Sequence, residues 1–367
     1  MKIVIFGLSI TSTWGNGHGN TYRALARALH QRGHKIVFFE RDLEWYRKNR
    51  DLPNPAFCKL YLYETWPQIL RRARAELTDC DLAIVGSYFP DGHQACDLML
   101  GSRAGIKAFY DIDTPITMAA LRSSGGNDYV RREHLRALDL YLSFTGGPVL
   151  REICEVFGAP LAAPLYCSFD PEQYRPRPRT RRFACDLSYM GTYAADRQPK
   201  IEQFLCQPAR RLSAQKFIVA GPQYPKTLRW PGNVKRIRHL NPRWHPLFYS
   251  SSRLTLNVTR RDMVLAGYSP SVRLFEAAAC GATIVSDNWP GLESLFTPGE
   301  QILLPVSTSE VERLLREVDD AELRRIGVSA AERVHAEHTS DHRARELELL
   351  VEKASSRQPI HSAAKAV

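Results

Sequence analysis

The chain has 367 residues, 44% hydrophobic and 24% charged, which is enough for two globular domains with separate cores. No apolar run approaches the length of a membrane span, and the first residues resemble a strand rather than a signal peptide. The formal net charge of +11 is compatible with an anionic partner, but no helix-turn-helix, zinc-finger or RNA-recognition pattern accompanies the basic residues. The eight cysteines include no Cys-x-x-Cys pair, so we expect a cytoplasmic protein with reduced cysteines and neither a zinc site nor a disulfide framework.

The first half of the chain alternates short apolar runs with helical patterns. Buried strands are predicted at residues 2–6, 35–39, 82–85, 106–110 and 141–144. Between the first two strands, Asn20 is placed to cap a helix that carries Leu25 and Leu29 and ends at Gly33. A strand, a helix and a strand at this spacing predict parallel α/β units with right-handed crossovers.

A segment rich in proline and arginine, residues 170–178, interrupts this alternation and is expected to be an extended connector. Basic residues are concentrated in and just after it, at Arg175, Arg177, Arg179, Arg181 and Arg182. A solvated basic face is one interpretation of the chain's positive charge. Attraction to an anionic membrane surface is the other.

The second half repeats the α/β pattern. Strands are predicted at residues 187–190, 216–220, 234–237, 254–258 and 283–286, and helices at 196–205, 310–318 and 341–353. The last helix carries Leu347, Leu350 and Val351 on one face. The predicted fold class is therefore α/β, with Rossmann-like domains at 1–168 and 183–338, a linker at 169–182, a final helix at 339–355 and a flexible tail at 356–367.

Ligands of open α/β sheets bind beyond the carboxyl ends of the strands, so the loops at those ends are the candidate sites. The loop after the first strand has glycines at alternate positions, Gly15, Gly17 and Gly19, which let the backbone approach a ligand closely. Their even spacing does not fit the Gly-x-Gly-x-x-Gly fingerprint and argues against an NAD enzyme. His18 in this loop is either a ligand contact or a structural histidine.

Two carboxylates one residue apart, Asp111 and Asp113, follow a buried strand and could supply a catalytic base. The alternative is a turn in which Asp113 caps Thr114 and Pro115. After the strand at 187–190, the turn of Gly191 and Thr192 leads to Arg197, a combination that suits a pyrophosphate.

A third stretch, residues 256–281, carries a carboxylate in the first turns of a helix. Ser269, Pro270 and Ser271 introduce this helix, and Gly281 is placed to end it. The helix holds Glu276 near free backbone amides, so a phosphate could bind the helix start while the carboxylate binds a sugar diol. The alternative is an ordinary amphipathic helix with an Arg273–Glu276 pair.

The sequence Phe-Glu-Ala-Ala-Ala-Cys-Gly-Ala at 275–282, then Ile-Val-Ser-Asp at 284–287 and Gly-Leu-Glu at 291–293, resembles the donor-binding signature of the GT-B glycosyltransferases. The resemblance is nearest to the group-1-like branch with the CgeB-like spore maturation proteins, whose blocks also resemble residues 109–115, 143–148, 256–260 and 268–276. In that superfamily the glutamate matching Glu276 binds the ribose of a nucleotide-sugar. Tyr268 stands where retaining members have a second glutamate.

The resemblance implies a GT-B fold, in which two Rossmann-like domains face each other across a cleft and the C-terminal helix crosses back to the N-terminal domain. It implies transfer of a sugar from a nucleoside-diphosphate-sugar to an acceptor hydroxyl, without a metal or other cofactor. The residues expected to bind the donor are Glu276, Arg197, Arg260, Arg273, Gly191, Thr192, Tyr268, Ser269 and Ser271. The loop of Gly15, Gly17, His18 and Gly19 would face the acceptor or the donor phosphates. In an inverting enzyme Asp111, Asp113 or His18 would be the base, whereas a retaining enzyme would use same-face attack; the sequence leaves both open.

Two other functions are compatible with this fold: a non-hydrolysing sugar-nucleotide epimerase, and a nucleotide-binding protein that has lost its activity. For the transferase, the acceptor is expected to be a lipid-linked molecule, polysaccharide, protein or small molecule, in polysaccharide, glycolipid or surface glycan synthesis. Peripheral contact with the anionic inner face of the membrane is expected, and a nucleic-acid partner is not.

Overall fold

The first apolar run forms β1 (Lys2–Phe6), which lies inside a seven-stranded sheet of order β3-β2-β1-β4-β5-β6-β7. The structure is a computed structural model that describes residues 1–15 and 17–358. All pairings in this sheet are parallel. The remaining strands are β2 (Lys35–Arg41), β3 (Lys59–Tyr63), β4 (Leu82–Gly86), β5 (Ile106–Asp111), β6 (Leu140–Ser143) and β7 (Ala162–Pro164). The helices of this domain are α1 (His18–Gln31), α2 (Glu44–Arg47), α3 (Trp66–Leu77), α4 (Gly92–Leu100), α5 (Thr114–Ser124), α6 (Arg132–Ala137) and α7 (Pro148–Glu155).

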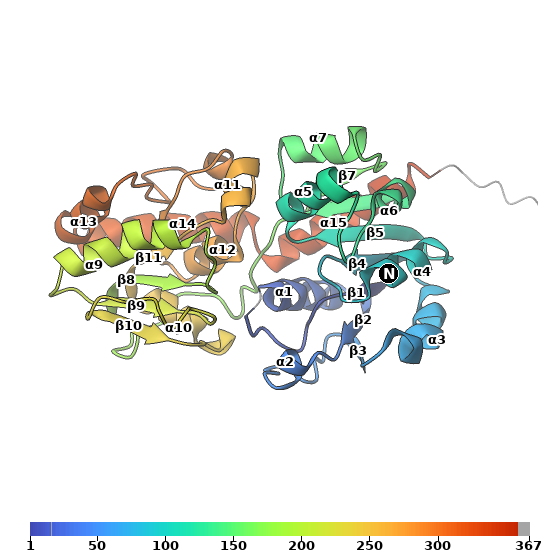
Figure 1. The fold of residues 1–367 in the computed structure, drawn as a ribbon, viewed down its shortest axis with the longest axis horizontal. Coiled ribbons are helices and arrows are strands. Elements are labelled where there is room, and N and C mark those ends of the chain that lie inside the picture. Colours follow the sequence, from blue (N-terminus) through green and yellow to red (C-terminus); the bar gives the residue numbers. More distant parts are fainter. Residues whose placement is uncertain (16, 359–367) are drawn as a thin grey trace, which may run out of the picture.

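The second domain is built on a five-stranded parallel sheet of order β10-β9-β8-β11-β12, which lies beside the first domain in Figure 1. Its strands are β8 (Cys185–Met190), β9 (Phe217–Ala220), β10 (Val234–Ile237), β11 (Ser252–Asn257) and β12 (Thr283–Ser286). Its helices are α8 (Gln198–Ile201), α9 (Gln207–Arg211), α10 (His245–Ser251), α11 (Arg261–Ala266), α12 (Val272–Ala279), α13 (Thr308–Glu317) and α14 (Asp320–Glu337). Shorter helical turns are η1 (Glu202–Cys206), η2 (Pro242–Trp244) and η3 (Leu292–Ser294).

The apolar runs became strands because a parallel sheet covered by helices is buried on both faces. In β1, Ile3, Val4, Ile5 and Phe6 are at most 1% exposed. Every strand predicted from the sequence is present, with ends that differ by at most two residues, so the predicted α/β class is confirmed. The edge strands β3 and β7 were not predicted. β3 alternates Lys, Leu and Tyr at the sheet edge, and β7 has only three residues.

The starts of α1 and α8 differ from the prediction, and α13 and the C-terminal helix α15 (Ser340–Ser355) begin two residues and one residue earlier than expected. Asn20 does not cap α1, because the helix begins at His18 with Gly17 at its N-cap, and Asn20 is instead in the first turn. The helix predicted at 196–205 begins at Gln198, with Pro199 in its first turn, and continues through the wide turn η1 into α9. Because Asn20 does not cap α1, its side chain is available to contact Glu276 of the second domain.

The C-terminal helix α15 (Ser340–Ser355) crosses back and packs against α1 of the first domain, as predicted (Figure 1). Leu347 and Val351 are buried on it. Its start lies beside the other crossing of the chain between the domains, because Ser340 N donates to Phe169 O at 2.9 Å. Glu348 of α15 accepts hydrogen bonds from Arg32 at 2.6 Å and 2.9 Å and lies 2.7 Å from His34 Nε2.

Glu348 should make the docking of α15 depend on pH. The hydrogen bond from Arg32 is the main cause that lowers the pKa of Glu348 from 4.5 to about 2. Because the folded pKa lies below the unfolded one, the stabilisation is present above about pH 4.5 and is lost as the pH falls toward about 2. Glu348→Gln should therefore lower the free energy of unfolding by about 1 kcal/mol near neutral pH and much less in acid. Urea unfolding at both pH values checks this. Glu352→Gln, which removes an exposed carboxylate from the same helix, should cause no such difference.

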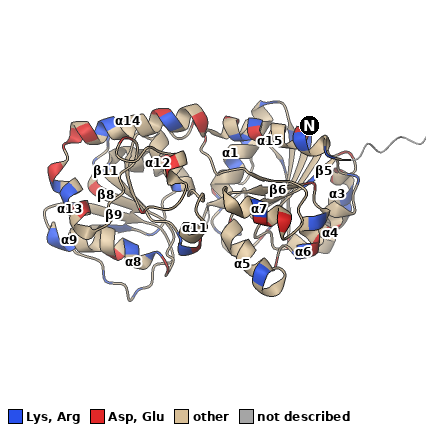
Figure 2. Ribbon diagram, turned by 90° about the horizontal axis from the view of Figure 1, so that it is seen from above, with Lys and Arg blue, Asp and Glu red and all other residues tan. Residues whose placement is uncertain are grey.

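The surface charges are mixed. Figure 2 shows basic and acidic residues together on helices of both domains, among them α14, α13 and α7. No helix of residues 1–15 and 17–358 is long and apolar enough to cross a bilayer.

Candidate functional site

A cavity of about 950 Å³ lies between the two domains. The strand order of the first sheet reverses between β1 and β4, and that of the second reverses between β8 and β11. Such reversal points are where open α/β sheets bind ligands. The cavity wall comes from the loops after β1, β5 and β6 in one domain and after β8, β9, β10 and β11 in the other, together with the start of α12. The carboxyl ends of the two sheets therefore share one site.

Glu276 lies in this wall on α12 and is only 4% exposed. Its Oε1 accepts a hydrogen bond from Asn20 Nδ2 at 3.0 Å, across the gap between the domains. Its Oε2 is 3.7 Å from His245 Nδ1, which also lies 3.1 Å from the hydroxyl of Tyr174. Burial, with the nearby carboxylate of Glu276, raises the pKa of Tyr174 well above its ordinary value, so the phenol stays protonated. Glu276 is thus a buried carboxylate held in place from three directions and open to the cavity.

Arg273 supports the helix start and does not pair with Glu276 in the described structure. Its Nη1 donates to Asn257 Oδ1 at 2.7 Å, and its Nε donates to the carbonyl of Met190. Ser271, at the N-cap of α12, donates its hydroxyl to the same Asn257 oxygen at 2.9 Å instead of capping the helix. A Cβ on Gly191 would lie 2.8 Å from Arg273 Nη2, so the guanidinium packs closely against the turn after β8. These contacts join the ends of β8 and β11 to α12.

Three further arginines line the same cavity, Arg197, Arg260 and Arg261, and the first two are the ones expected to bind the donor. Arg197 Nη2 donates to Thr192 O at 2.5 Å, while its Nε is buried without a hydrogen-bond partner in the described structure. Arg260 is 40% exposed, and its Nε is 3.8 Å from Asp196 Oδ2. Thr192 Oγ1 lies 3.4 Å from Gly15 O of the opposite domain. Both guanidinium groups are therefore free to donate to an anion between the sheets.

On the first domain, His18 and Asp113 face the cavity together. His18 Nε2 is 3.8 Å from Asp113 Oδ2, and His18 Nδ1 is buried without a partner in the part of the chain that is described. Burial acts to raise the pKa of Asp113, but His18, Arg260 and Tyr88 together lower it. Asp113 is therefore ionised at neutral pH and is placed to stabilise a protonated His18. Asp113 is also the N-cap residue of α5, although its side chain makes no capping hydrogen bond.

Asp111 does not belong to this group. It is fully buried and absent from the cavity wall. In the core it accepts hydrogen bonds from Tyr141 and, at 3.0 Å, from Thr117 Oγ1. Burial raises the pKa of Asp111 to about 6. Asp111 is the last residue of β5 and its side chain is buried in the core, whereas Asp113 lies beyond the strand, where the chain has left the sheet, and lines the cavity. Asp113 alone remains as a candidate base from this pair.

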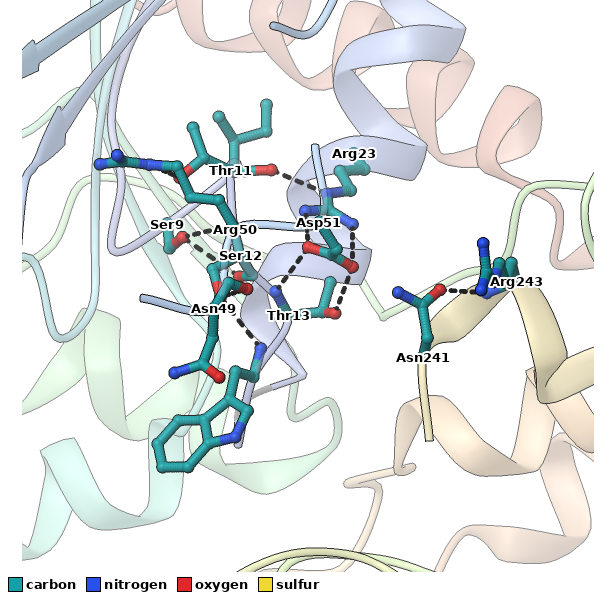
Figure 3. Close-up of polar contacts among 12 residues, drawn as sticks. Ser9, Thr11, Ser12, Thr13, Arg23, Asn49, Arg50, Asp51, Asn241 and Arg243 are labelled. Atoms are coloured by element: carbon teal, nitrogen blue, oxygen red, sulfur yellow. Dashed lines mark hydrogen bonds and ion pairs between the residues drawn. The ribbon is translucent and has the colours of Figure 1, made fainter. Parts of the chain in front are cut away.

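Two acids, Glu40 and Asp51, hold residues 9–13, which lead into the glycine loop; Figure 3 shows the contacts of Asp51. Glu40, fully buried, accepts hydrogen bonds from the backbone of Ile10 and Thr11 and from the hydroxyls of Ser9 and Thr11. Asp51 accepts from the backbone and hydroxyl of Thr13 and forms a two-armed pair with Arg23.

The glycines of this loop serve different purposes. Gly15 and Gly17 line the cavity, but Gly19 does not, and a Cβ there would lie 2.6 Å from Ser12 O. The glycine at position 19 is therefore required by packing within the loop.

Tyr268 is absent from the cavity wall and lies between the two domains. A Cβ added to Gly147 of the first domain, or to Gly291 of the second, would lie 2.3 Å from its ring. Its carbonyl accepts from Gly146 N at 2.8 Å, and the hydroxyl of the next residue, Ser269, is 2.9 Å from that of Thr145. Tyr268 has a φ of 48°, uncommon for a bulky residue. It is a contact between domains, whereas Ser269 lines the cavity.

Gly147→Ala should therefore disturb the contact between the domains. The new methyl would meet the Tyr268 ring, and the backbone at position 147 has φ 66° and ψ −145°, which only glycine adopts readily. We expect a loss of about 3 kcal/mol of stability. Gly33→Ala is the matched control, because φ is also positive there but nothing lies within 4 Å of the added atom. It should cost about 1 kcal/mol. Equal shifts of the thermal midpoint in both variants would contradict the contact.

Sequence reasoning missed Asn20, Tyr174 and His245 as parts of the site. Each reaches Glu276 or its neighbours from a different element: α1, the connector and α10. The sequence carries a signal for Asn20, because this polar residue directly follows the glycine loop, which lies at the carboxyl ends of the strands. No group of three or more His, Cys, Asp or Glu residues in the described ranges is arranged to hold a metal ion.

Comparisons with known proteins agree with this architecture. Residues 197–348 match the model of a family described as glycosyl transferase-like. The comparison with curated proteins found no match. Sucrose-phosphate synthase from Thermosynechococcus elongatus is similar with a TM-score of 0.69 and 14% identity, over 97% of this chain and 99% of that one. HepE from Anabaena, in complex with UDP and glucose, is similar with a TM-score of 0.68 and 13% identity, over 96% of this chain and 100% of that one.

An alpha-glucosyltransferase in complex with UDP gives a TM-score of 0.69 and 13% identity, over 96% of this chain and 100% of that one. These similarities extend across both domains. The chain therefore has the GT-B fold of glycosyltransferases, and its C-terminal domain matches the glycosyl transferase-like family over residues 197–348.

Proposed function

We propose that this protein is a glycosyltransferase that moves a sugar from a uridine-diphosphate sugar to an acceptor hydroxyl. The observation that carries the proposal is the buried Glu276 carboxylate on α12, facing a cavity onto which the carboxyl ends of both sheets open. The family match spans Arg197, Arg260, Arg273 and Glu276. UDP or UDP-glucose is named with two of the similar structures, HepE and the alpha-glucosyltransferase, which supports uridine as the base.

The donor side would act on the charge of the leaving group. As the glycosidic bond breaks, the diphosphate becomes more anionic, and donors fixed in advance stabilise that charge where it develops. The buried Nε atoms of Arg197 and Arg260 make no hydrogen bond among the described residues, and the backbone amides at the start of α12 add a further positive potential. Glu276 would bind the ribose and contribute positioning rather than proton transfer.

The acceptor side would use His18 as general base, with Asp113 stabilising the imidazolium that forms. Both residues lie in the cavity wall of the first domain, opposite the arginines of the second. The acceptor hydroxyl would approach between them and the donor. No metal or other cofactor takes part in this proposal.

We further propose that the protein is nearest the CgeB-like branch, because the blocks at 109–115 and 268–276 resemble that branch. We also propose that its reaction takes place in the cytoplasm, at the inner face of an anionic membrane.

We propose a glycan, lipid-linked, protein or small-molecule acceptor rather than nucleic acid, because basic and acidic residues are interspersed on the surface (Figure 2). One similar alpha-glucosyltransferase was solved with a 13-mer DNA. Salt-sensitive binding of duplex DNA that UDP does not displace would contradict our choice.

The test is a thermal-shift screen with UDP, GDP, dTDP, ADP and CMP, followed by assays with UDP-sugars. A ligand that binds only the folded state raises the melting temperature by mass action. We expect UDP to give the largest shift and acceptor extracts to accelerate consumption of the donor. Conversion of UDP-sugar that is independent of acceptor would favour an epimerase instead. Binding of UDP without any turnover would favour a protein that kept the fold and lost the activity.

A further inference from the structure

A second cavity, of about 560 Å³, lies behind Glu276. Its wall comes from α1 and the loop at 51–52 of the first domain, from residues 168–177 in and just before the connector, and from η2, α10 and Glu276 in the second domain. It shares Asn20, Pro242 and Glu276 with the larger cavity and is otherwise separate from it. The hydrogen bond from Asn20 to Glu276 thus forms part of a partition between the two cavities.

Arginine dominates the charge of this second cavity. Its wall contains four arginines, Arg23, Arg27, Arg177 and Arg243, and three carboxylates, Asp51, Asp170 and Glu276. Arg23 is paired with Asp51 and Arg27 with Asp170. Arg177 and Arg243 form no ion pair with a carboxylate in the part of the chain that is described, and the four arginines of the wall exceed its three carboxylates by one positive charge.

Arg177 is the one basic residue of the connector that turns inward. Arg175, Arg179, Arg181 and Arg182 are exposed, whereas Arg177 is half-buried. Its backbone amide donates to Ser250 Oγ at 3.0 Å, which fixes the chain at this point. A half-buried guanidinium is costly without a counter-charge, and here an anion entering the cavity would supply one.

Arg243 approaches from the second domain. It lies on η2, whose N-cap Asn241 accepts a hydrogen bond from the Arg243 amide at 3.1 Å. Figure 3 shows Asn241 and Arg243 on one side and the Arg23–Asp51 pair of the first domain on the other. The wall between them also includes the apolar side chains of Leu52, Phe169 and Leu247. A small ligand with an anionic end and a less polar body fits this combination.

We propose that the second cavity binds a phosphate group, free or as a phosphomonoester, between Arg177 and Arg243. Guanidinium groups suit phosphate because their planar donors match its oxygens in pairs. A phosphate bound there would touch the connector and the second domain beside α1, and would hold the domains in the arrangement in which Asn20 contacts Glu276. The ligand is an effector rather than the acceptor, because Glu276 separates this cavity from His18 and Asp113. The effector role rests on the proposed function in one respect: the bound phosphate would affect binding of the nucleotide-sugar donor.

The experiment is a calorimetric titration of the full chain with inorganic phosphate, in the presence of saturating UDP to fill the larger cavity. We expect one binding event, weakened about tenfold or more in the double variant Arg177→Ala and Arg243→Ala. The matched control, Arg71→Ala with Arg103→Ala, removes the same charge from exposed positions outside both cavities. It should leave the titration unchanged. By linkage, phosphate should also tighten UDP binding in the unmodified protein and not in the double variant.

Separate arms with inorganic phosphate and glycerol phosphate identify which form binds more tightly. The proposal is overturned if phosphate does not bind the UDP-saturated protein, if both double variants bind it equally, or if UDP displaces it. If UDP itself does not bind, the proposed function fails. The comparison of the two double variants without UDP then still decides whether this cavity takes phosphate.

Discussion

Glu276→Ala is expected to weaken UDP binding by about 100-fold while the protein stays folded. The carboxylate would accept two hydrogen bonds from a ribose diol, and each bond to a charged group contributes about 1.5–3 kcal/mol. The fold should survive because the side chain borders the two cavities rather than filling a core position. Calorimetric titration with UDP gives the affinity, and circular dichroism confirms that the variant is folded.

Two comparisons sharpen this expectation. Glu332→Ala removes an exposed acid of the same domain that does not line the cavity, and it should bind UDP normally. Asn20→Ala removes only the neighbour that orients Glu276, and it should cause a smaller loss, of roughly tenfold. An unchanged UDP affinity in Glu276→Ala would remove this residue from the donor site.

His18→Ala is expected to lower kcat by about 100-fold to 10,000-fold and to leave the Kd for UDP nearly unchanged. His18 lies on the first domain, whereas the arginines that would hold the diphosphate lie on the second. Loss of a general base slows proton removal from the acceptor but does not remove a donor contact. Asp113→Asn should also lower kcat, but by less than His18→Ala, because the imidazole remains and only its counter-charge is lost.

A second histidine–aspartate pair provides the control for this test. His134 Nε2 is 2.9 Å from Asp97 Oδ1, and neither residue lines the cavity. Asp97→Asn should therefore leave kcat unchanged. Steady-state kinetics with a UDP-sugar and an acceptor, together with UDP titration, separate the two effects. A large rise in the Kd for UDP in His18→Ala, with kcat retained, would show that His18 contacts the donor instead.

The fold could be predicted largely from local patterns. The apolar runs that became β1, β4 and β5 are flanked by helical periodicity, and this alternation alone predicts parallel α/β domains. The strand β3 could not be predicted in the same way, because a half-exposed edge strand lacks a continuous apolar run. The helix around residue 200 was placed two residues early, because the run of polar residues before Pro199 does not show which of them begins the helix.

The site was only partly predictable, for a different reason. Glu276, Arg197 and Arg260 follow strand ends of one domain, so chain order places them near one another. The contact from Asn20 to Glu276 joins residues 256 positions apart and depends on how the domains pack, which no local pattern contains. Asp111 and Asp113 were indistinguishable in sequence, and only their positions, at the end of β5 and beyond it, separate a core acid from one that faces the cavity.

The two acids behind the glycine loop have a consequence for protein engineering. Because Glu40 and Asp51 hold residues 9–13 through backbone and hydroxyl groups, the loop cannot be exchanged for that of a relative as an isolated segment. A graft of the loop alone would leave Glu40 buried without its donors, at a cost of several kcal/mol. A chimera that keeps its activity must carry the loop, the end of β2 and Asp51 with its partner Arg23 as one transplanted unit.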